Sequence, residues 1–311
     1  MASRRRTKRG RGKTPSLFYL ALSFLAGAAL ASLLFFLISE KRPPSKPVSA
    51  PAPKEEVPAV PSEKPLFRPP PPVIKGPCVA IIIDDIGYRR SDVVRFASIP
   101  YPIALSIIPF TPFDTYSARY AHSKGKDVML HVPMQPNHTS EAIERLERRT
   151  KGMLLERMSS TQIVELLRRE LARVPYAVAA NNHMGSRFTQ NPEKVAVVLR
   201  FLYGHSLFFV DSVTTSHSAV CRVAKDSGLV ALKRDVFLDN SKSVNYIKGQ
   251  LEELGRIALK KGYAIAIGHP HVSTYRALVE MLPRLESEGV KVVSVKDIYR
   301  AVLEGEYEGC L

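Results

Sequence analysis

Apolar runs and amphipathic stretches alternate along residues 78–311. Short uninterrupted apolar runs predict strands that are buried on both faces, and apolar positions at helical spacing predict helices. The predicted strands are residues 79–83, 103–108, 127–132, 177–181, 207–211, 230–233, 264–268 and 290–294. The predicted helices are residues 115–124, 160–173, 192–203, 244–261 and 275–288, the second of them with a capping box at its start.

This order of strands and helices predicts parallel strands joined by crossover helices. Seven or eight such units within residues 78–311 favour a (β/α) barrel, with an open doubly wound sheet as the alternative. The segment contains no internal repeat and no low-complexity tract. We therefore expect one α/β domain over residues 78–311.

Polar residues follow most of the predicted strands directly. Because the carboxyl ends of parallel strands share one rim of a barrel, we expect these side chains to meet there. In chain order the residues are Asp84, Asp85, His131, Asn181, Asn182, His183, Ser186, Arg187, Asp211, Ser212 and His269.

The adjacent carboxylates of Asp84 and Asp85 repel each other, so a half-buried pair requires a cation, a shared proton or hydrogen-bond donors. Imidazole and carboxylate together are ligands for zinc and other divalent transition metals. Such a site suits hydrolysis of an ester or an amide. The alternatives are structural: either Asp could cap the following helix, His131 could be a core histidine, and His269 could bond a neighbouring loop.

The residues before position 78 have a different composition. Residues 1–13 contain seven Lys or Arg and no acidic residue, and residues 16–39 carry no charge. The pattern predicts a basic cytoplasmic tail over residues 1–15 and a transmembrane signal-anchor over residues 16–39. The folded domain would then lie on the periplasmic or extracellular side of the inner (cytoplasmic) membrane. The alternative is a signal peptide that is cleaved near residues 29–31.

A linker connects these two parts of the chain. Residues 41–77 contain 13 of the 24 prolines, which indicates a semi-rigid extended tether over residues 40–77. Residues 1–77 also hold 14 basic and 4 acidic residues, a net +10 of the total +16. Because most of the positive charge precedes the folded domain, we do not expect nucleic acid as a partner.

Three cysteines, Cys78, Cys221 and Cys310, are too few for a disulfide framework or a thiolate metal site. One disulfide is possible in an oxidising compartment, with the pairing open, and buried free thiols are the default expectation.

Five segments, in this order, resemble the divergent polysaccharide deacetylase family of the NodB-like polysaccharide deacetylase superfamily. They are Ile-Asp84-Asp85-Ile-Gly87, His131-Val-Pro-Met134, Asn182-His183-Met-Gly-Ser186, Asp211-Ser212 and Gly268-His269-Pro270. The resemblance covers roughly residues 78–303. It implies a deformed (β/α) barrel and metal-dependent removal of N- or O-acetyl groups from cell-wall polysaccharide or exopolysaccharide.

The resemblance also implies roles for individual residues. Asp84 becomes the base, Asp85 a metal ligand and His269 the acid, and His131 stands at the second ligand position. None of the eight histidines form the usual His-x-x-x-His pair, so we infer that His183 supplies the third ligand, and zinc is the expected ion. The remaining candidates, for substrate binding or support of the ligands, are Asn182, Ser186, Arg187, Asp211 and Ser212.

The usual Arg-Pro-Pro-Tyr segment of the superfamily is missing, and Arg187 with the Ser186 region is its nearest substitute. These departures leave a second hypothesis: an envelope protein without catalytic activity that binds glycan or acts as a scaffold through the same rim.

Overall fold

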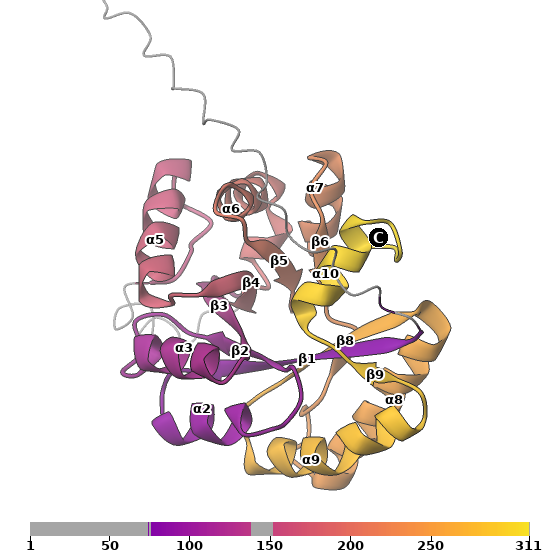
Figure 1. Cartoon of the computed structure of the whole chain (residues 1–311). Coiled ribbons are helices and arrows are strands. Elements are labelled where there is room, and N and C mark those ends of the chain that lie inside the picture. Colours follow the sequence, from indigo (N-terminus) through magenta and orange to yellow (C-terminus); the bar gives the residue numbers. More distant parts are fainter. Residues whose placement is uncertain (1–73, 75, 138–151, 311) are drawn as a thin grey trace, which may run out of the picture. The chain divides into compact units, whose positions relative to one another are not determined.

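The structure is a computed structural model that describes residues 74, 76–137 and 152–310 (Figure 1). The predicted cytoplasmic tail, the predicted signal-anchor and all but the last few linker residues lie outside this range. None of the helices within the range is long and apolar enough to cross a membrane.

The described strands form one sheet in which every ladder is parallel, as the sequence predicts. The strands are β1 (Cys78–Ile86), β2 (Ala104–Ile107), β3 (Asp127–Met134), β4 (Ala177–Met184), β5 (Phe208–Asp211), β6 (Ala231–Lys233), β7 (Val236–Phe237), β8 (Tyr263–Gly268) and β9 (Lys291–Val292).

The strand order is β6-β5-β4-β3-β2-β1-β8-β7, with β9 paired to the beginning of β1. The two outer strands, β6 and β7, are consecutive in the chain. Arg234 N–H donates to Asp211 O on β5, and Asp235 N–H donates to Ile265 O on β8, so the chain crosses between the two edges. No ladder joins β6 to β7 among the described residues. The fold is therefore a deformed, incompletely closed barrel, and the short strand β7 was not predicted.

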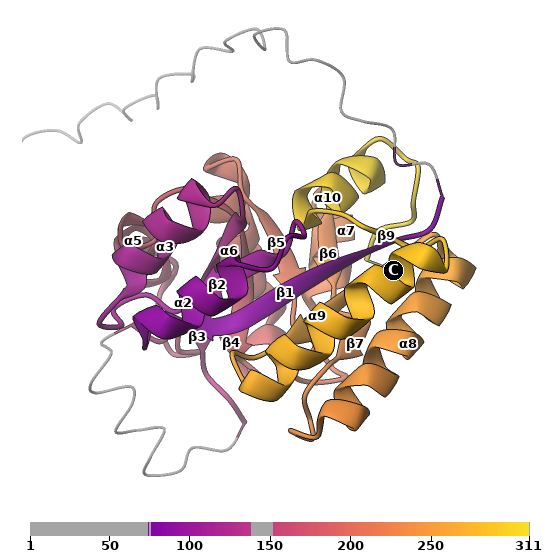
Figure 2. The same ribbon diagram turned by 60° about the horizontal axis from the view of Figure 1, so that its bottom comes forward.

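Helices surround the outer face of this sheet (Figures 1 and 2). All five predicted helices are present, and Ser159 and Gln162 form the predicted capping box of α5. The helices are α2 (Arg90–Ala97), α3 (Asp114–Ser123), α5 (Ser160–Arg173), α6 (Pro192–Gly204), α7 (Val220–Asp226), α8 (Val244–Lys261), α9 (Val272–Ser287) and α10 (Val295–Leu303), with the 3-10 turn η1 (Phe188–Gln190).

Alternation along the strands divides the core in two. One set of strand residues, for example Ile81 and Ile83, packs against the surrounding helices. The residues between them face the inside of the barrel, where α10 covers them. This inner cluster includes Ala80, Ile82, Ala104, Met129, Ala179, Val210, Leu232 and Ile265, with Val295, Ile298 and Val302 of α10.

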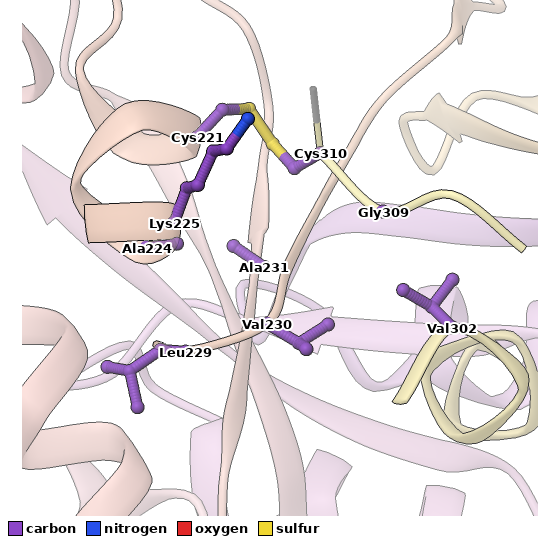
Figure 3. Close-up of a pocket in the computed structure, with 9 residues that line it drawn as sticks. All are labelled: Cys221, Ala224, Lys225, Leu229, Val230, Ala231, Val302, Gly309 and Cys310. Carbon is purple, nitrogen blue, oxygen red and sulfur yellow. A yellow bond between two sulfur atoms is a disulfide. The ribbon is translucent and has the colours of Figure 1, made fainter. Parts of the chain in front are cut away.

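The C-terminal segment is tied to the amino ends of the strands. A disulfide joins Cys310 to Cys221 on α7, and Cys310 N–H donates to Ala231 O at the start of β6. Figure 3 shows the disulfide beside a largely apolar cavity of about 220 Å³. The expectation of free thiols is therefore wrong for these two cysteines and holds for Cys78, which is buried and free.

Candidate functional site

The candidate site continues the inner face of the barrel by one more layer. Two residues beyond the inner core positions Ile82, Ala104, Met129 and Ala179, the same face carries the polar residues Asp84, Ser106, His131 and Asn181. All four polar side chains are buried. The change from apolar to polar residues at the carboxyl ends of four neighbouring strands therefore builds a polar floor for the rim.

Asp85 reaches this rim because the backbone turns. Simple alternation would direct Asp85 to the outer face, but its φ of 58° lies in the left-handed region and the β1 ladder is irregular between Ile83 and Ile86. Gly87 follows with a φ of 124°, and a Cβ at this position would lie 2.2 Å from Thr111 Oγ1. The Asp-Asp-Ile-Gly segment thus redirects the second carboxylate without displacing the first.

Three ligand atoms converge at the turn. His183 Nδ1 lies 3.0 Å from Asp85 Oδ1, and His131 Nε2 lies 3.3 Å from the same oxygen. The three atoms all lie within 4.8 Å of one another. Asp85 Oδ1 is buried and accepts no hydrogen bond from the described residues. One carboxylate and two imidazoles around an oxygen without a donor fit a divalent transition metal such as zinc.

The electrostatics of Asp85 agree with this arrangement. Burial alone would raise the pKa of Asp85, but contacts with His131 and His183 outweigh burial and hold the pKa well below its ordinary value. The carboxylate is therefore ionised and free to bind a cation.

Asp84 is the more deeply buried carboxylate of the pair. It is 3% exposed, Asn181 Nδ2 donates to its Oδ1 at 2.8 Å, and His131 Nε2 lies 3.5 Å from its Oδ2. Burial raises the pKa of Asp84, and the charge of His131 and the hydrogen bond from Asn181 offset only part of that effect. A carboxylate with an increased proton affinity beside the ligand atoms is suited to act as a base.

His269 also lies beside Asp85, with Nε2 3.9 Å from Asp85 Oδ2. Asp239 holds its ring: His269 Nδ1 donates to Asp239 Oδ1 at 2.9 Å, and His269 N–H and Thr274 Oγ1 donate to Oδ2. Burial alone would lower the pKa of His269, but Asp239 raises it to about 9. His269 is therefore protonated at neutral pH and can donate a proton from Nε2.

Asp239 was not among the candidates from the sequence. It lies just beyond β7, a strand of two residues, so no apolar run draws attention to it. The only local signal is that an acidic residue follows Phe237 and Leu238.

Several sequence candidates support the rim loops. Asn182 Oδ1 accepts from Ser212 N–H and Asn182 Nδ2 donates to Met184 O, while Ser212 Oγ accepts from Asn181. Asp211 lies two residues after Phe209 on β5 and therefore faces the outside of the barrel, as Phe209 does. Its Oδ1 accepts a hydrogen bond from Val213 N–H, so Asp211 stabilises a turn and is not one of the converging ligands.

The expected arginine is in a different place. Arg187 is paired with Glu156 at 2.6 Å on the surface, and Ser186 Oγ accepts from Asn137 N–H. Arg234, not identified from the sequence, donates to Ser212 O and Val213 O. It interacts electrostatically with Asp211, Asp235 and, more weakly, Asp84.

Residues 81–299 match the divergent polysaccharide deacetylase family. The chain belongs to this family. It is 37% identical over 214 residues to the uncharacterized protein YibQ of Escherichia coli, a match that covers 69% of this chain and 65% of that protein. It is 32% identical over 222 residues to an uncharacterized protein of Haemophilus influenzae, covering 71% and 76%. The match thus spans less than two thirds of the Escherichia coli relative.

The fold is also similar to a solved structure. The crystal structure of the uncharacterized protein ATU2773 from Agrobacterium tumefaciens C58 superimposes with a TM-score of 0.67 at 20% identity, over 73% of this chain and 91% of that one. This likeness supports the deformed barrel.

Proposed function

We propose that this divergent polysaccharide deacetylase is a metal-dependent hydrolase that removes acetyl groups from a glycan of the cell envelope. The observation that carries the proposal is the convergence of Asp85 Oδ1, His131 Nε2 and His183 Nδ1 within 4.8 Å, beside the buried carboxylate of Asp84 and the imidazole of His269. Family membership supports the substrate class.

Asp85, His131 and His183 would hold the ion, with zinc as the expected metal. A bound divalent ion would polarise the acetyl carbonyl and make a water molecule more acidic. Asp84 accepts the proton of the attacking water, because its Oδ2 faces the ligand cluster while Asn181 occupies its Oδ1.

His269 donates a proton to the leaving nitrogen or oxygen of the sugar, so that the leaving group departs as a neutral amine or alcohol. Asp239 keeps the imidazole charged and fixes the ring so that Nε2 faces Asp85. Base and acid therefore both lie beside the ligand cluster, within reach of a substrate held there.

The domain is proposed to lie on the outer side of the cytoplasmic membrane. Residues 16–39 form the anchor in this proposal, and residues 40–77 act as an extended spacer that lets the domain reach the glycan. The Cys221–Cys310 disulfide supports this location, because disulfides persist in oxidising compartments.

The experiment that tests the proposal combines metal analysis with acetate release. Purified full-length protein, loaded with zinc, cobalt or nickel, is incubated with N-acetylated and O-acetylated oligosaccharides. We expect one bound ion per chain and release of acetate that a chelator abolishes. Protein that binds no ion and releases no acetate with any of the three metals would overturn the proposal and favour a glycan-binding or scaffold role.

A further inference from the structure

Asn181 is a fully buried amide at the centre of the polar floor, on β4. An amide side chain has two N–H donors and two acceptor lone pairs, and Asn181 uses all four. Its Nδ2 donates to Asp84 Oδ1 at 2.8 Å and to Ser212 Oγ at 3.3 Å. Its Oδ1 accepts from Ser106 Oγ at 2.5 Å and from His131 Nδ1 at 2.9 Å.

The partners determine which way this amide faces. Nδ2 of Asn181 points toward Asp84 Oδ1 and Ser212 Oγ, to both of which it donates. Oδ1 then points toward His131, and His131 Nδ1 must carry the ring proton. The same tautomer leaves the lone pair of His131 on Nε2, the atom that lies 3.3 Å from Asp85 Oδ1.

The amide joins two buried side chains. His131 is 1% exposed and Asp84 is 3% exposed, so both are almost fully buried. A leucine of similar shape at position 181 would leave both without this partner, which is costly for buried polar groups. An aspartate would keep an acceptor for His131 Nδ1 but would put a second carboxylate against Asp84.

We propose that Asn181 is a positioning residue that orients the base Asp84 and selects the tautomer of the metal ligand His131 through one amide. The inference rests on the proposed function and deepens it. Asn181 would thus couple the base Asp84 to the ligand His131, although Asn181 itself is neither a ligand, the base nor the acid.

Two variants of the full-length protein separate the two halves of this role. Asn181→Leu removes both the acceptor for His131 and the donor to Asp84. We therefore expect the zinc Kd to rise about 10- to 100-fold and kcat to fall. Competition with a chromophoric chelator measures the Kd. Asn181→Asp keeps the acceptor for His131 and removes the donor to Asp84. We expect it to retain the zinc affinity of the wild type and to lose turnover.

Asn191→Ala is the matched control. Asn191 is also an asparagine with a structural hydrogen bond: its Oδ1 accepts from Lys194 N–H at the start of α6, and it is none of the proposed ligands, the base or the acid. It should lower the thermal unfolding temperature and leave the zinc Kd unchanged. Unfolding curves of all variants identify any that fail to fold.

A measurement on the wild type does not depend on any variant. In ¹⁵N–¹H spectra of the zinc-loaded protein, His131 should show its ring proton on Nδ1. A proton on Nε2 would overturn the proposal, as would unchanged zinc affinity in Asn181→Leu or equal loss of affinity in Asn181→Asp and Asn181→Leu.

The zinc measurements also separate this inference from the proposed function. If the wild type binds zinc but releases no acetate, the proposed hydrolysis fails, and the contrast in affinity between the two variants still decides the role of Asn181. If acetate is released and Asn181→Leu binds zinc like the wild type, the hydrolase stands and the positioning role is rejected.

Discussion

The two ends of the barrel are built from the same strands and have opposite character. At the carboxyl ends, the inner-face positions are polar, buried and joined in one hydrogen-bond network around Asn181. At the amino ends, the inner face is apolar, α10 covers it, and the Cys221–Cys310 disulfide ties the C-terminal segment down. The comparison indicates that one end serves chemistry and the other stability.

Strained backbone is more frequent at the carboxyl ends of the strands. Among the described residues, four of the six non-glycine residues with positive φ (Asp85, Phe110, Met184 and Val213) lie at or shortly after the carboxyl end of a strand, and the other two, Tyr176 and Ser206, lie just before β4 and β5. Such conformations cost about 1–3 kcal/mol each and persist only where the surrounding structure imposes them. We infer that the packed and cross-linked amino ends support the strained rim, so that variants at the two ends should affect different quantities.

The largest effect is expected from Asp84→Asn. The amide keeps the size of the side chain but cannot accept a proton from water, so kcat for acetate release should fall about 10²- to 10⁴-fold. The thermal unfolding temperature should change little. The control is Asp297→Asn, the same substitution at the start of α10, which should keep full activity. Turnover retained in Asp84→Asn would remove Asp84 from the mechanism.

The disulfide should show the reverse behaviour. Replacing Cys221 and Cys310 together by serine removes a link between residues 89 positions apart. We expect the free energy of unfolding in urea to fall by about 2–4 kcal/mol, because the unfolded chain gains conformational freedom. The kcat below the unfolding transition should stay unchanged. A loss of activity in the folded double variant would show that the two ends are coupled.

Asp239→Asn tests whether His269 is the general acid. The amide can still accept from His269 but no longer stabilises its charge, so kcat should fall about 10²-fold. The pKa of His269 is about 9 in the presence of Asp239, so activity that requires the protonated ring should decline above that pH. In the variant this alkaline limb of the kcat/KM profile should move to lower pH. An unmoved limb would mean that another group is the acid.

The smallest effect is expected at Glu170, a buried carboxyl on a helix of the outer layer. Glu170 on α5 is fully buried, and neither of its oxygens has a hydrogen-bond partner among the described residues. Burial raises its pKa well above the ordinary value of 4.5, so the folded state keeps a proton that the unfolded chain releases. Stability should therefore fall as the pH rises from about 4.5 toward the raised pKa of the folded state.

Glu170→Met removes this ionisable group while preserving the approximate size of the side chain. We expect the free energy of unfolding at pH 7 to increase by about 1–3 kcal/mol, and its pH dependence to become flatter. Denaturant titrations at pH 5 and pH 8 measure both changes. A variant that is less stable at pH 8 would show that Glu170 has a structural partner when ionised.

Much of the fold could be read from local patterns. The runs around Ile81, Leu130 and Ile265 are apolar because parallel strands are covered on both faces, and they were recognised for that reason. The short strand β7 and the helices α2, α7 and α10 were not among the predicted elements, because two to nine residues carry little periodic signal and depend on tertiary packing.

The site was predicted in part for a similar reason. Asp84, Asp85, His131, His183 and His269 follow strands, and the structure brings them together. Asp211 also follows a strand but stabilises a turn, Asn181 was expected at the rim without a specific role, and Asp239 was not among the candidates. Whether a side chain faces inward depends on strand register and on turns such as the one at Asp85.

The sequence by itself determined the parallel α/β architecture, the family and the set of polar residues at the strand ends, because these are recorded in short contiguous segments. Only the tertiary structure decided that Asp239 serves His269, that Asn181 joins Asp84 to His131, and that Cys221 pairs with Cys310. Each of these contacts joins residues far apart in the chain, and their distance in space is set by how the strands close into a barrel.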